Sequence, residues 1–413
     1  MSVRFYFLDS VNVFTVHHTR RTKMNRTADI VVIGGGINGC CTAYYLAKRG
    51  VRKITLIEKG HIASGPTGRS SGIVRQHYSH ETLAAMARDS VNVWENFADE
   101  VGGDAGFVRC GVVFFAGEKN AQSLRTTVAM HQRIGIRASL LSGEELQRME
   151  SALYADDIVC GAYESEGGYA DPALAANSFC EAAERLGVEV LKKTEVLELK
   201  VEAGKITGIV TSKGQVSAEV VINVGGPWGG KIAAMAGVYI PIKSSRHPVV
   251  ILQRPAQWRK PTPVWGDLVK GWYFKPERST AIMVGSLHDI DDEVSIENHS
   301  TVPSYQEIEA YSAAILKRFP VMAEGLAQGG WAGLYDVTPD WQPVIDRIPE
   351  VQGFYCAVGF SGSGFKIGPA VGKIMAELVL DGRCSSYDIS LFRYARFQEK
   401  HSSRGAYEYG IVG

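Results

Sequence analysis

Ile30-Val31-Val32-Ile33-Gly34-Gly35-Gly36-Ile37-Asn38-Gly39 decides the fold, because an apolar run ends there in closely spaced glycines. The run predicts a buried strand, and the glycines predict a tight turn into a helix over Cys40–Arg49. In such a unit Gly34 makes the turn, Gly36 lets the backbone approach a pyrophosphate, and Gly39 lets the helix pack closely on the strand.

A second strand follows at the spacing that a βαβ unit requires. It is Ile54-Thr55-Leu56-Ile57, and it ends in Glu58-Lys59. A carboxylate at the position of Glu58 can accept hydrogen bonds from ribose hydroxyls. A glycine turn before a helix also serves plain packing, but here the strands, the helix and the acid agree. The segment therefore predicts a bound dinucleotide.

Composition excludes several classes of function. The 413 residues carry 44 basic and 44 acidic side chains, so no net charge attracts nucleic acid or an anionic membrane surface. No apolar run approaches the length that crosses a bilayer, which predicts that the protein has no membrane span. An anionic substrate must then be bound by local charges.

The cysteines and the first residues bear on location. Seven cysteines, an odd number without a CxxC pair or a nearby histidine at ligand spacing, predict free thiols in a reducing, cytoplasmic compartment and no metal site. Residues 1–27 are basic, which is typical of an organelle presequence and equally of an upstream extension of the reading frame before Met24. We favour the extension and expect residues 1–27 to be poorly ordered.

The order of elements predicts an α/β protein with two sheets. An apolar strand over Glu219–Val224 exits through Gly225-Gly226-Pro227-Trp228, which predicts a return to the nucleotide-binding sheet. Residues 240–290 are rich in short alternating strands that fit an antiparallel sheet covering a substrate site. We expect helices over residues 81–100, 119–134, 143–149, 173–186, 304–319 and 369–380.

Several segments, in chain order, resemble one family. They are the glycine motif, the loop through Arg75, the exit at 225–228, the segment Gly333-Leu334-Tyr335-Asp336-Val337-Thr338-Pro339-Asp340 and the segment Gly359-Phe360-Ser361-Gly362-Ser363-Gly364-Phe365-Lys366. From about residue 28 to 400 the chain is similar to the FAD-dependent amine and amino-acid oxidoreductases of the D-amino-acid oxidase, glycine oxidase and sarcosine oxidase group, including sarcosine oxidase β-subunits.

The resemblance implies a Rossmann-type FAD-binding domain and a second domain on a mixed, largely antiparallel sheet. The FAD-binding domain is expected to be discontinuous, from residues 28–110, 170–235 and 330–413, and the substrate domain to comprise residues 111–169 and 236–329. The residues expected to bind FAD are Gly34, Gly36, Ile37, Asn38, Gly39, Glu58, Lys59, Ser64, Thr67, Gly68, Arg69, Ser70, Ser71, Val196, Gly225, Gly226, Trp228, Gly359, Ser361, Gly362, Ser363, Gly364, Phe365 and Lys366. NAD is the alternative, but an NAD domain leaves the second glycine segment unexplained.

Three residues are expected to act on the substrate. Arg75 and Lys366 match the family's carboxylate partners, and a guanidinium can hold a carboxylate through two hydrogen bonds. Tyr335 matches a pocket tyrosine, and Tyr273 is a weaker candidate. The plainer alternatives are a loop arginine paired with an acid, a solvated lysine and core aromatics. None of the ten histidines stands in a recognisable motif, although His77 lies near Arg75.

The sequence departs from the family at three positions. Gly333 and Arg69 stand where relatives carry a cysteine or a histidine that attaches the flavin, which predicts noncovalent FAD. Met283 stands near the position of a lysine that assists oxygen reduction, and this tilts the expectation toward a dehydrogenase.

The resulting hypothesis is an FAD-dependent enzyme that oxidises a secondary or N-methylated amino acid. The electron acceptor is oxygen or another protein, and both homo- and hetero-oligomers stay open. Two alternatives are a flavoprotein subunit of a multi-subunit amine dehydrogenase and a flavin-binding protein without amine chemistry. The sequence does not say which amine is used.

Overall fold

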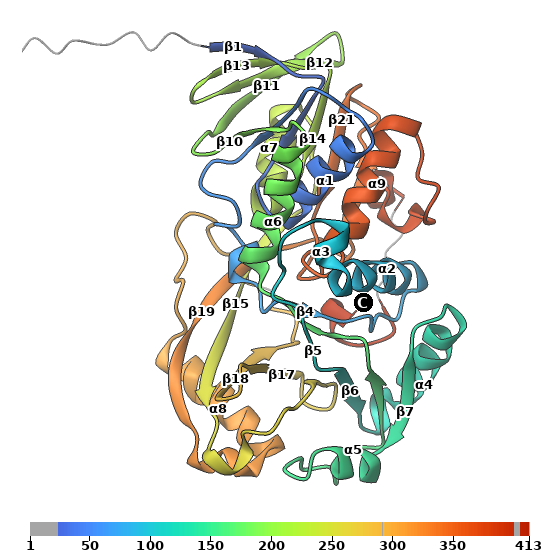
Figure 1. The fold of residues 1–413 in the computed structure, drawn as a ribbon, viewed down its shortest axis with the longest axis vertical. Coiled ribbons are helices and arrows are strands. Elements are labelled where there is room, and N and C mark those ends of the chain that lie inside the picture. The colour runs from blue at the N-terminus through green and yellow to red at the C-terminus, as the bar shows by residue number, and fades with distance from the viewer. Residues whose placement is uncertain (1–23, 291, 400–404, 413) are drawn as a thin grey trace, which may run out of the picture.

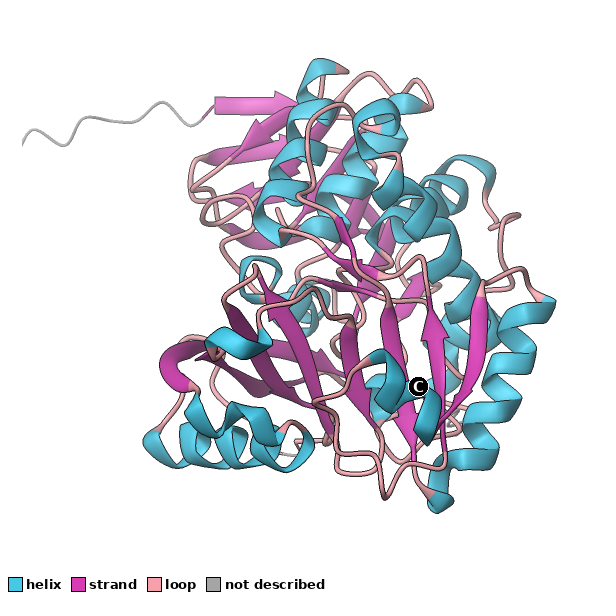
Figure 2. Cartoon of the chain, turned by 60° about the horizontal axis from the view of Figure 1, so that its bottom comes forward, coloured by secondary structure: helices cyan, strands magenta, loops and turns pink. Residues whose placement is uncertain are grey.

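The computed structural model describes residues 24–290, 292–399 and 405–412. The two largest sheets lie in different halves of the molecule, one in the upper half of Figure 1 and one in the lower half. Figure 2 shows that most helices lie around the upper sheet and along the outer edges of the lower sheet. No helix in the described ranges is long and apolar enough to cross a membrane.

The six-stranded sheet is parallel except at one edge. In sheet order its strands are β10 (Glu189–Leu191), β3 (Ile54–Ile57), β2 (Ile30–Ile33), β14 (Val220–Asn223), β21 (Phe354–Val358) and β20 (Val344–Arg347). Only β20 runs antiparallel to its neighbour. The strands β2, β3 and β14 are almost wholly buried, which explains their uninterrupted apolar sequences. The expected return of residues 220–223 to the nucleotide-binding sheet is confirmed.

Helices cover this sheet on the side of the main hydrophobic core. They are α1 (Ile37–Lys48), α2 (Glu81–Glu95), α3 (Phe97–Glu100), α6 (Pro172–Arg185) and α9 (Gly368–Asp381). The first helix packs against both α6 and α9. The approach to α9 is close because Gly372 carries no side chain: a Cβ there would lie 2.7 Å from the backbone of Cys41. A short helix, α7 (Gly229–Met235), follows the glycine exit after β14.

The eight-stranded sheet forms the other half of the molecule. In sheet order its strands are β19 (Leu326–Val337), β15 (Lys243–Gln253), β18 (Ala281–Ser286), β17 (Trp272–Glu277), β16 (Val264–Asp267), β6 (Val112–Ala116), β8 (Cys160–Glu164) and β7 (Ala138–Ser142). Only the β16–β6 pair is parallel. Its helices are α4 (Glu118–Arg133), α5 (Gly143–Met149) and α8 (Tyr305–Arg318). The expected α/β class, with a mixed and largely antiparallel second sheet, is confirmed.

Two smaller sheets complete the fold. One contains β1 (Met24–Thr27), β13 (Gly214–Ser217), β12 (Lys205–Thr211) and β11 (Val196–Glu202), and the other contains β4 (Ile73–Val74), β9 (Gly168–Tyr169) and β5 (Val108–Arg109). Residues 24–27 pair in register with β13, so the expectation of disorder is wrong for these four residues. Residues 1–23 lie outside the described residues.

Two expected boundaries differ from the structure. The helix expected over residues 81–100 is divided at Asn96, whose φ of −106° and ψ of 29° leave helical geometry and whose amide donates to the Asn92 carbonyl oxygen. The proposed domain boundary at residues 329/330 falls inside β19, which pairs with β15 along most of its length. The second sheet therefore continues to Val337.

Candidate functional site

A cavity of about 740 Å³ lies where the two large sheets meet. Its walls combine the turn after β2, the end of β3, the loop before β4, the exit of β14, strands of the eight-stranded sheet and the turn before α9. The residues expected to bind cofactor or substrate that line it are Gly34, Gly36, Ile37, Asn38, Glu58, Lys59, Ser64, Thr67, Arg69, Ser70, Ser71, Arg75, Val196, Gly225, Gly226, Trp228, Tyr335, Gly362, Gly364, Phe365, Lys366 and the weaker candidate Tyr273.

In the turn between β2 and α1, the backbone of glycines without side chains faces the cavity. Gly34 has a φ of +123°, and a Cβ there would lie 2.5 Å from the Val224 carbonyl oxygen, so a side chain does not fit. The first turn of α1 carries no acidic side chain, and the N–H of Ile37 donates to the neutral Thr67 hydroxyl at 3.1 Å, so no negative charge in that turn neutralises the positive end of the helix dipole. This end of the cavity suits an anion such as a pyrophosphate.

Glu58 fixes the loop beside that turn. One carboxylate oxygen accepts a hydrogen bond from the backbone N–H of Gly35 at 2.7 Å and the other from that of Gly60 at 2.6 Å. Carboxylate oxygens have further lone pairs, so Glu58 retains the capacity to accept from ribose hydroxyls. Nearby, the Lys59 ammonium lies 3.5 Å from the centre of the Trp228 ring.

Five residues of the expected FAD set do not line the cavity: Gly39, Gly68, Gly359, Ser361 and Ser363. They lie behind the residues that line the cavity. A Cβ on Gly39 would lie 1.8 Å from the Gly34 carbonyl oxygen, so this glycine allows the close packing of α1 on the turn. The Ser363 hydroxyl donates to the Phe360 carbonyl oxygen at 2.6 Å. Direct cofactor contacts from these five stay predictions.

Arg75 follows β4 and is buried, with 5% of its surface exposed. Its guanidinium donates to the carbonyl oxygens of His77 and Ile411, the latter at 2.6 Å, and lies 4.1 Å from the centre of the Tyr78 ring. It forms no ion pair with a carboxylate of the described residues, so the alternative of an arginine neutralised by an acid does not hold within them. A buried guanidinium with only carbonyl partners attracts an incoming carboxylate.

Lys366 reaches the same cavity from the turn before α9. Only 6% of it is exposed, and its Nζ donates to the Gly362 carbonyl oxygen at 3.2 Å, so it is not a solvated surface lysine. Burial holds the pKa of Lys366 well below its usual range, and the positive charge of Arg75 lowers this pKa further. A bound carboxylate would raise the pKa of Lys366 again, because its negative charge stabilises the charged ammonium.

Tyr335 and His247 form the wall from the eight-stranded sheet. The two rings stack with their centres 3.7 Å apart, and both residues line the cavity. The Ser245 hydroxyl donates to the Ile290 carbonyl oxygen, so the His247 Nε2–H donates to Ser245 at 3.1 Å and Nδ1 keeps a lone pair. That Nδ1 has no partner among the described residues. The sequence analysis missed His247; its only signal was its place on an alternating strand of the second sheet.

The two glycine-containing segments near the carboxyl end meet beside the cavity. The Asp336 carboxylate accepts hydrogen bonds from the backbone N–H groups of Gly359 and Phe360, at 2.7 and 3.2 Å. Burial raises the pKa of Asp336 to about 6. These bonds fix the glycine turn that presents Lys366, which explains why both segments carry the family resemblance.

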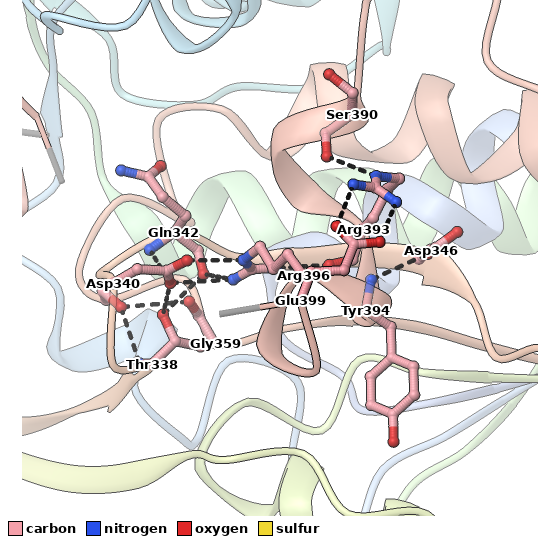
Figure 3. A network of polar contacts seen from close by, with 11 residues as sticks. Thr338, Asp340, Gln342, Asp346, Gly359, Ser390, Arg393, Tyr394, Arg396 and Glu399 are labelled. Carbon is pink, nitrogen blue, oxygen red and sulfur yellow. Dashed lines mark hydrogen bonds and ion pairs between the residues drawn. The ribbon is translucent and has the colours of Figure 1, made fainter. Parts of the chain in front are cut away.

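A polar network holds the turn after β19, and Figure 3 shows it from close by. Buried Arg396 donates to both carboxylate oxygens of Asp340, at 2.7 and 3.1 Å, and to the Gln342 carbonyl oxygen at 2.6 Å. The Thr338 hydroxyl donates to the same carbonyl oxygen at 2.7 Å. The helical turn Tyr394–Phe397, which carries Arg396, therefore ties the end of β19 to the sheet edge at β20.

Met283 and the described carboxyl-terminal residues add two observations. Met283 is buried in β18 and does not line the cavity; the lysines that do are Lys59, Lys231 and Lys366. Residues 405–412 cover the far side of Arg75, where Ile411 lines the cavity. Sequence reasoning missed this segment, because nothing in its local pattern marks a contact with a residue so distant along the chain.

Comparison with known proteins places these features in context. The profile of the family described as FAD dependent oxidoreductase matches residues 29–378. Sarcosine oxidase subunit beta of Rhodobacter capsulatus is 25% identical over 389 residues, with 91% of each chain covered. The structure of L-proline dehydrogenase from P. horikoshii superimposes with a TM-score of 0.84 at 30% identity, over 92% of this chain and 100% of that chain. Glycine oxidase from Geobacillus kaustophilus has the same fold, with a TM-score of 0.78 at 22% identity over 90% and 99% of the chains.

Proposed function

The chain belongs to the family of FAD-dependent oxidoreductases, and we propose that it oxidises a secondary or N-methylated amino acid such as sarcosine, dimethylglycine or proline. The observation that carries the proposal is buried Arg75, whose guanidinium lines the cavity and meets no carboxylate of the described residues. The names of the relatives, a sarcosine oxidase subunit and a proline dehydrogenase, support the same substrate class.

The cavity fits FAD by the chemistry of its walls. The open amino-terminal end of α1 and the bare turn at Gly34 and Gly36 suit the pyrophosphate, and Glu58 suits the adenosine ribose. The Asn38 side-chain oxygen is buried, lines the cavity and has no described partner, so it awaits a hydrogen-bond donor. When bound, FAD supplies the two-electron acceptor for a hydride that leaves the substrate carbon.

The residues of this chain would hold the amino acid for that transfer. Arg75, with Lys366 beside it, binds the carboxylate, and the ring pair of Tyr335 and His247 borders the remaining space. The unpartnered Nδ1 of His247 can accept a hydrogen bond from an N–H of a secondary amine, which would orient the substrate nitrogen. Loss of hydride from the neutral amine gives an iminium ion, and addition of water to this ion, with release of a proton, gives an amine and an aldehyde or keto product.

The electron acceptor is oxygen or another protein. We favour another protein, because Met283 stands near the position of the oxygen-assisting lysine and lies away from the cavity wall. The similarity to a protein named as a subunit supports a hetero-oligomer, and the second candidate function is therefore a subunit that needs a partner for turnover. All seven cysteines are free, which supports a reducing, cytoplasmic location.

The decisive test is an anaerobic absorbance titration of the purified flavin-loaded protein with sarcosine, dimethylglycine, proline and glycine. Bleaching of the flavin band by one of the first three, followed by slow recovery in air, is expected. Fast recovery in air would show that the electron acceptor is oxygen and not another protein. A flavin band that none of these amines bleaches, even with a co-purified partner present, would favour a flavin-binding protein without amine chemistry.

A further inference from the structure

Three buried side chains converge at one point behind Arg75. His77 follows β4, His131 lies in α4, and Glu164 ends β8. The Glu164 Oε1 lies 3.5 Å from the His77 Nδ1 and 3.8 Å from the His131 Nδ1, and the three ligand atoms all lie within 4.8 Å of one another. Both histidines are 0% exposed and the glutamate 1% exposed, so bulk solvent does not reach them.

The outer hydrogen bonds fix which ring nitrogens carry protons. The His131 Nε2 lies 2.9 Å from the Tyr78 carbonyl oxygen, which only accepts, so Nε2 carries the proton and Nδ1 keeps a lone pair. The His77 Nε2 lies 3.0 Å from the Tyr407 hydroxyl. That hydroxyl donates to Thr127, so the His77 Nε2 donates to it and the His77 Nδ1 is also bare.

Glu164 adds a third acceptor. Its Oε2 accepts a hydrogen bond from the backbone N–H of Gln76 at 2.8 Å, whereas Oε1 has no hydrogen-bond partner among the described residues. The distances from Oε1 to the two imidazole nitrogens exceed those of hydrogen bonds. Two lone pairs and a carboxylate oxygen thus face one another without a donor, which is costly in a buried site.

We propose that His77, His131 and Glu164 bind a divalent transition-metal ion of the Zn²⁺ type. A point equidistant from the three atoms lies about 2.0–2.4 Å from each, close to the bond lengths of zinc to imidazole and carboxylate. The hydrogen bond from the His131 ring to a backbone carbonyl is the outer contact that metal-bound histidines usually make. The fourth position of a tetrahedral ion is left for water.

The charges around this site determine how tightly it would bind a metal ion. The outer hydrogen bonds place the ring protons of both histidines on Nε2, so the two Nδ1 lone pairs are available to an ion. The positive charge of Arg75 repels a metal ion, whereas the negative charge of Glu164 attracts it. We therefore expect moderate affinity for the ion. The ion would tie the segment that carries Arg75 to α4 and β8, as a positioning element for the carboxylate binder.

Metal content of the full-length, flavin-loaded protein tests the proposal. The protein is incubated with Zn²⁺, dialysed, and measured by inductively coupled plasma mass spectrometry and by X-ray absorption at the zinc edge. About one ion per chain, with nitrogen and oxygen neighbours near 2.0 Å, is expected. Glu164→Gln and His131→Gln should each weaken zinc binding by at least about 100-fold, because each removes a direct ligand and loss of an outer contact alone costs about 10–100-fold. His288→Gln changes an exposed histidine and should leave the zinc content unchanged.

Two results would overturn the proposal. One is a wild-type chain that binds neither Zn²⁺, Co²⁺ nor Ni²⁺, which would leave a buried water or a shared proton among the three acceptors. The other is an undiminished zinc content in both Glu164→Gln and His131→Gln. Glu164→Gln keeps the side-chain shape, so it serves if His131→Gln does not fold. Zinc content is read without amine turnover, so the result does not depend on the proposed function.

Discussion

At the scale of single residues, the cavity is set apart by two buried basic side chains, Arg75 and Lys366. Neither pairs with a carboxylate of the described residues, and both instead donate to backbone carbonyl oxygens. A buried positive charge without an opposite partner costs folding free energy, and ligand binding is a common compensation for that cost. The burial and missing carboxylate partners of these two side chains therefore mark the proposed substrate site more strongly than the sequence motif does.

Replacing Arg75 by alanine should raise KM for the amine substrate by about 10–100-fold, because charged hydrogen bonds of about 1.5–3 kcal/mol are lost. FAD should stay bound, since no expected pyrophosphate or ribose contact involves this residue. Steady-state kinetics and the flavin absorbance of the purified variant check both. Arg109→Ala is the matched control, because Arg109 forms an exposed ion pair with Glu95. An unchanged KM in Arg75→Ala would remove Arg75 from the substrate site.

His247 should make the folded protein sensitive to acid. Burial lowers its pKa to about 3 from the usual 6.5, so between these values the unfolded chain binds a proton that the folded chain does not. The free energy of unfolding must then fall as the pH drops from 6.5 towards 3, by about 2–3 kcal/mol at pH 4.5. In His247→Phe, which can still stack on Tyr335, this share of the loss should disappear, whereas the shares of His77 and His131, whose pKa values burial also lowers, should remain. Urea denaturation at pH 7 and 4.5 measures it.

The exposed His61 gives the comparison for that experiment. His61→Phe should keep the full acid sensitivity of the wild-type protein. An identical pH dependence in wild type and His247→Phe would show that the His247 ring is protonated as readily in the folded chain as in the unfolded one.

At the scale of elements, turns and short helical segments hold the site in place, rather than long helices or strands. The turn after β19 is joined to the described carboxyl-terminal turns by the ion pair of Arg396 and Asp340, whose side chains are 4% and 3% exposed (Figure 3). Three residues earlier, Arg393 forms an ion pair with Glu399 whose partners are 45% and 39% exposed. The same segment therefore carries two arginine–carboxylate ion pairs, one buried and one exposed to water.

Arg396→Ala should destabilise the protein by about 3–5 kcal/mol, because it leaves the Asp340 carboxylate buried without its partner. Arg393→Ala should change stability little, because water solvates both members of that pair and screens their attraction. Thermal and urea unfolding of the two variants in the flavin-loaded state compare them directly. Equal effects from both substitutions would contradict the difference in burial on which the prediction rests.

At the scale of the whole molecule, the cavity exists because two sheets meet. The six-stranded sheet brings the open helix end and Glu58, whereas the eight-stranded sheet brings Tyr335 and His247. Arg69 and Gly333, the two positions where relatives attach flavin covalently, come from different segments and adjoin: a Cβ on Gly333 would lie 3.2 Å from the Cβ of Arg69. Neither residue offers a nucleophile.

The flavin should therefore leave the protein when the fold is lost. Precipitation with trichloroacetic acid is expected to release the yellow colour to the supernatant, where chromatography should identify FAD. Flavin that stays with the precipitated chain, and with a tryptic peptide in mass spectrometry, would contradict noncovalent binding. Gly333→Cys provides a comparison, because it restores a thiol at the position that relatives use.

Local sequence determined the elements whose signal is local. The apolar run and glycines at residues 30–39 specify β2, the turn and α1, because backbone sterics and burial of continuous apolar strands act over a few residues. The likeness of the segments at 333–340 and 359–366 to the family also led to Tyr335 and Lys366, which line the cavity. The first residues of α5 and of α8 follow from capping boxes at Ser142 and Ser304.

Tertiary structure alone decided what depends on distant partners. Strand β1 forms because β13 offers an edge to Met24–Thr27, and no local pattern encodes that edge. The free Nδ1 of His247 depends on Ser245 and Ile290, and the cluster at His77 depends on residues of α4 and β8. Burial, protonation and charge pairing are properties of an environment that distant segments build together. The sequence therefore determined the family and the cofactor, and the fold decided which side chains reach one cavity and in which charge state.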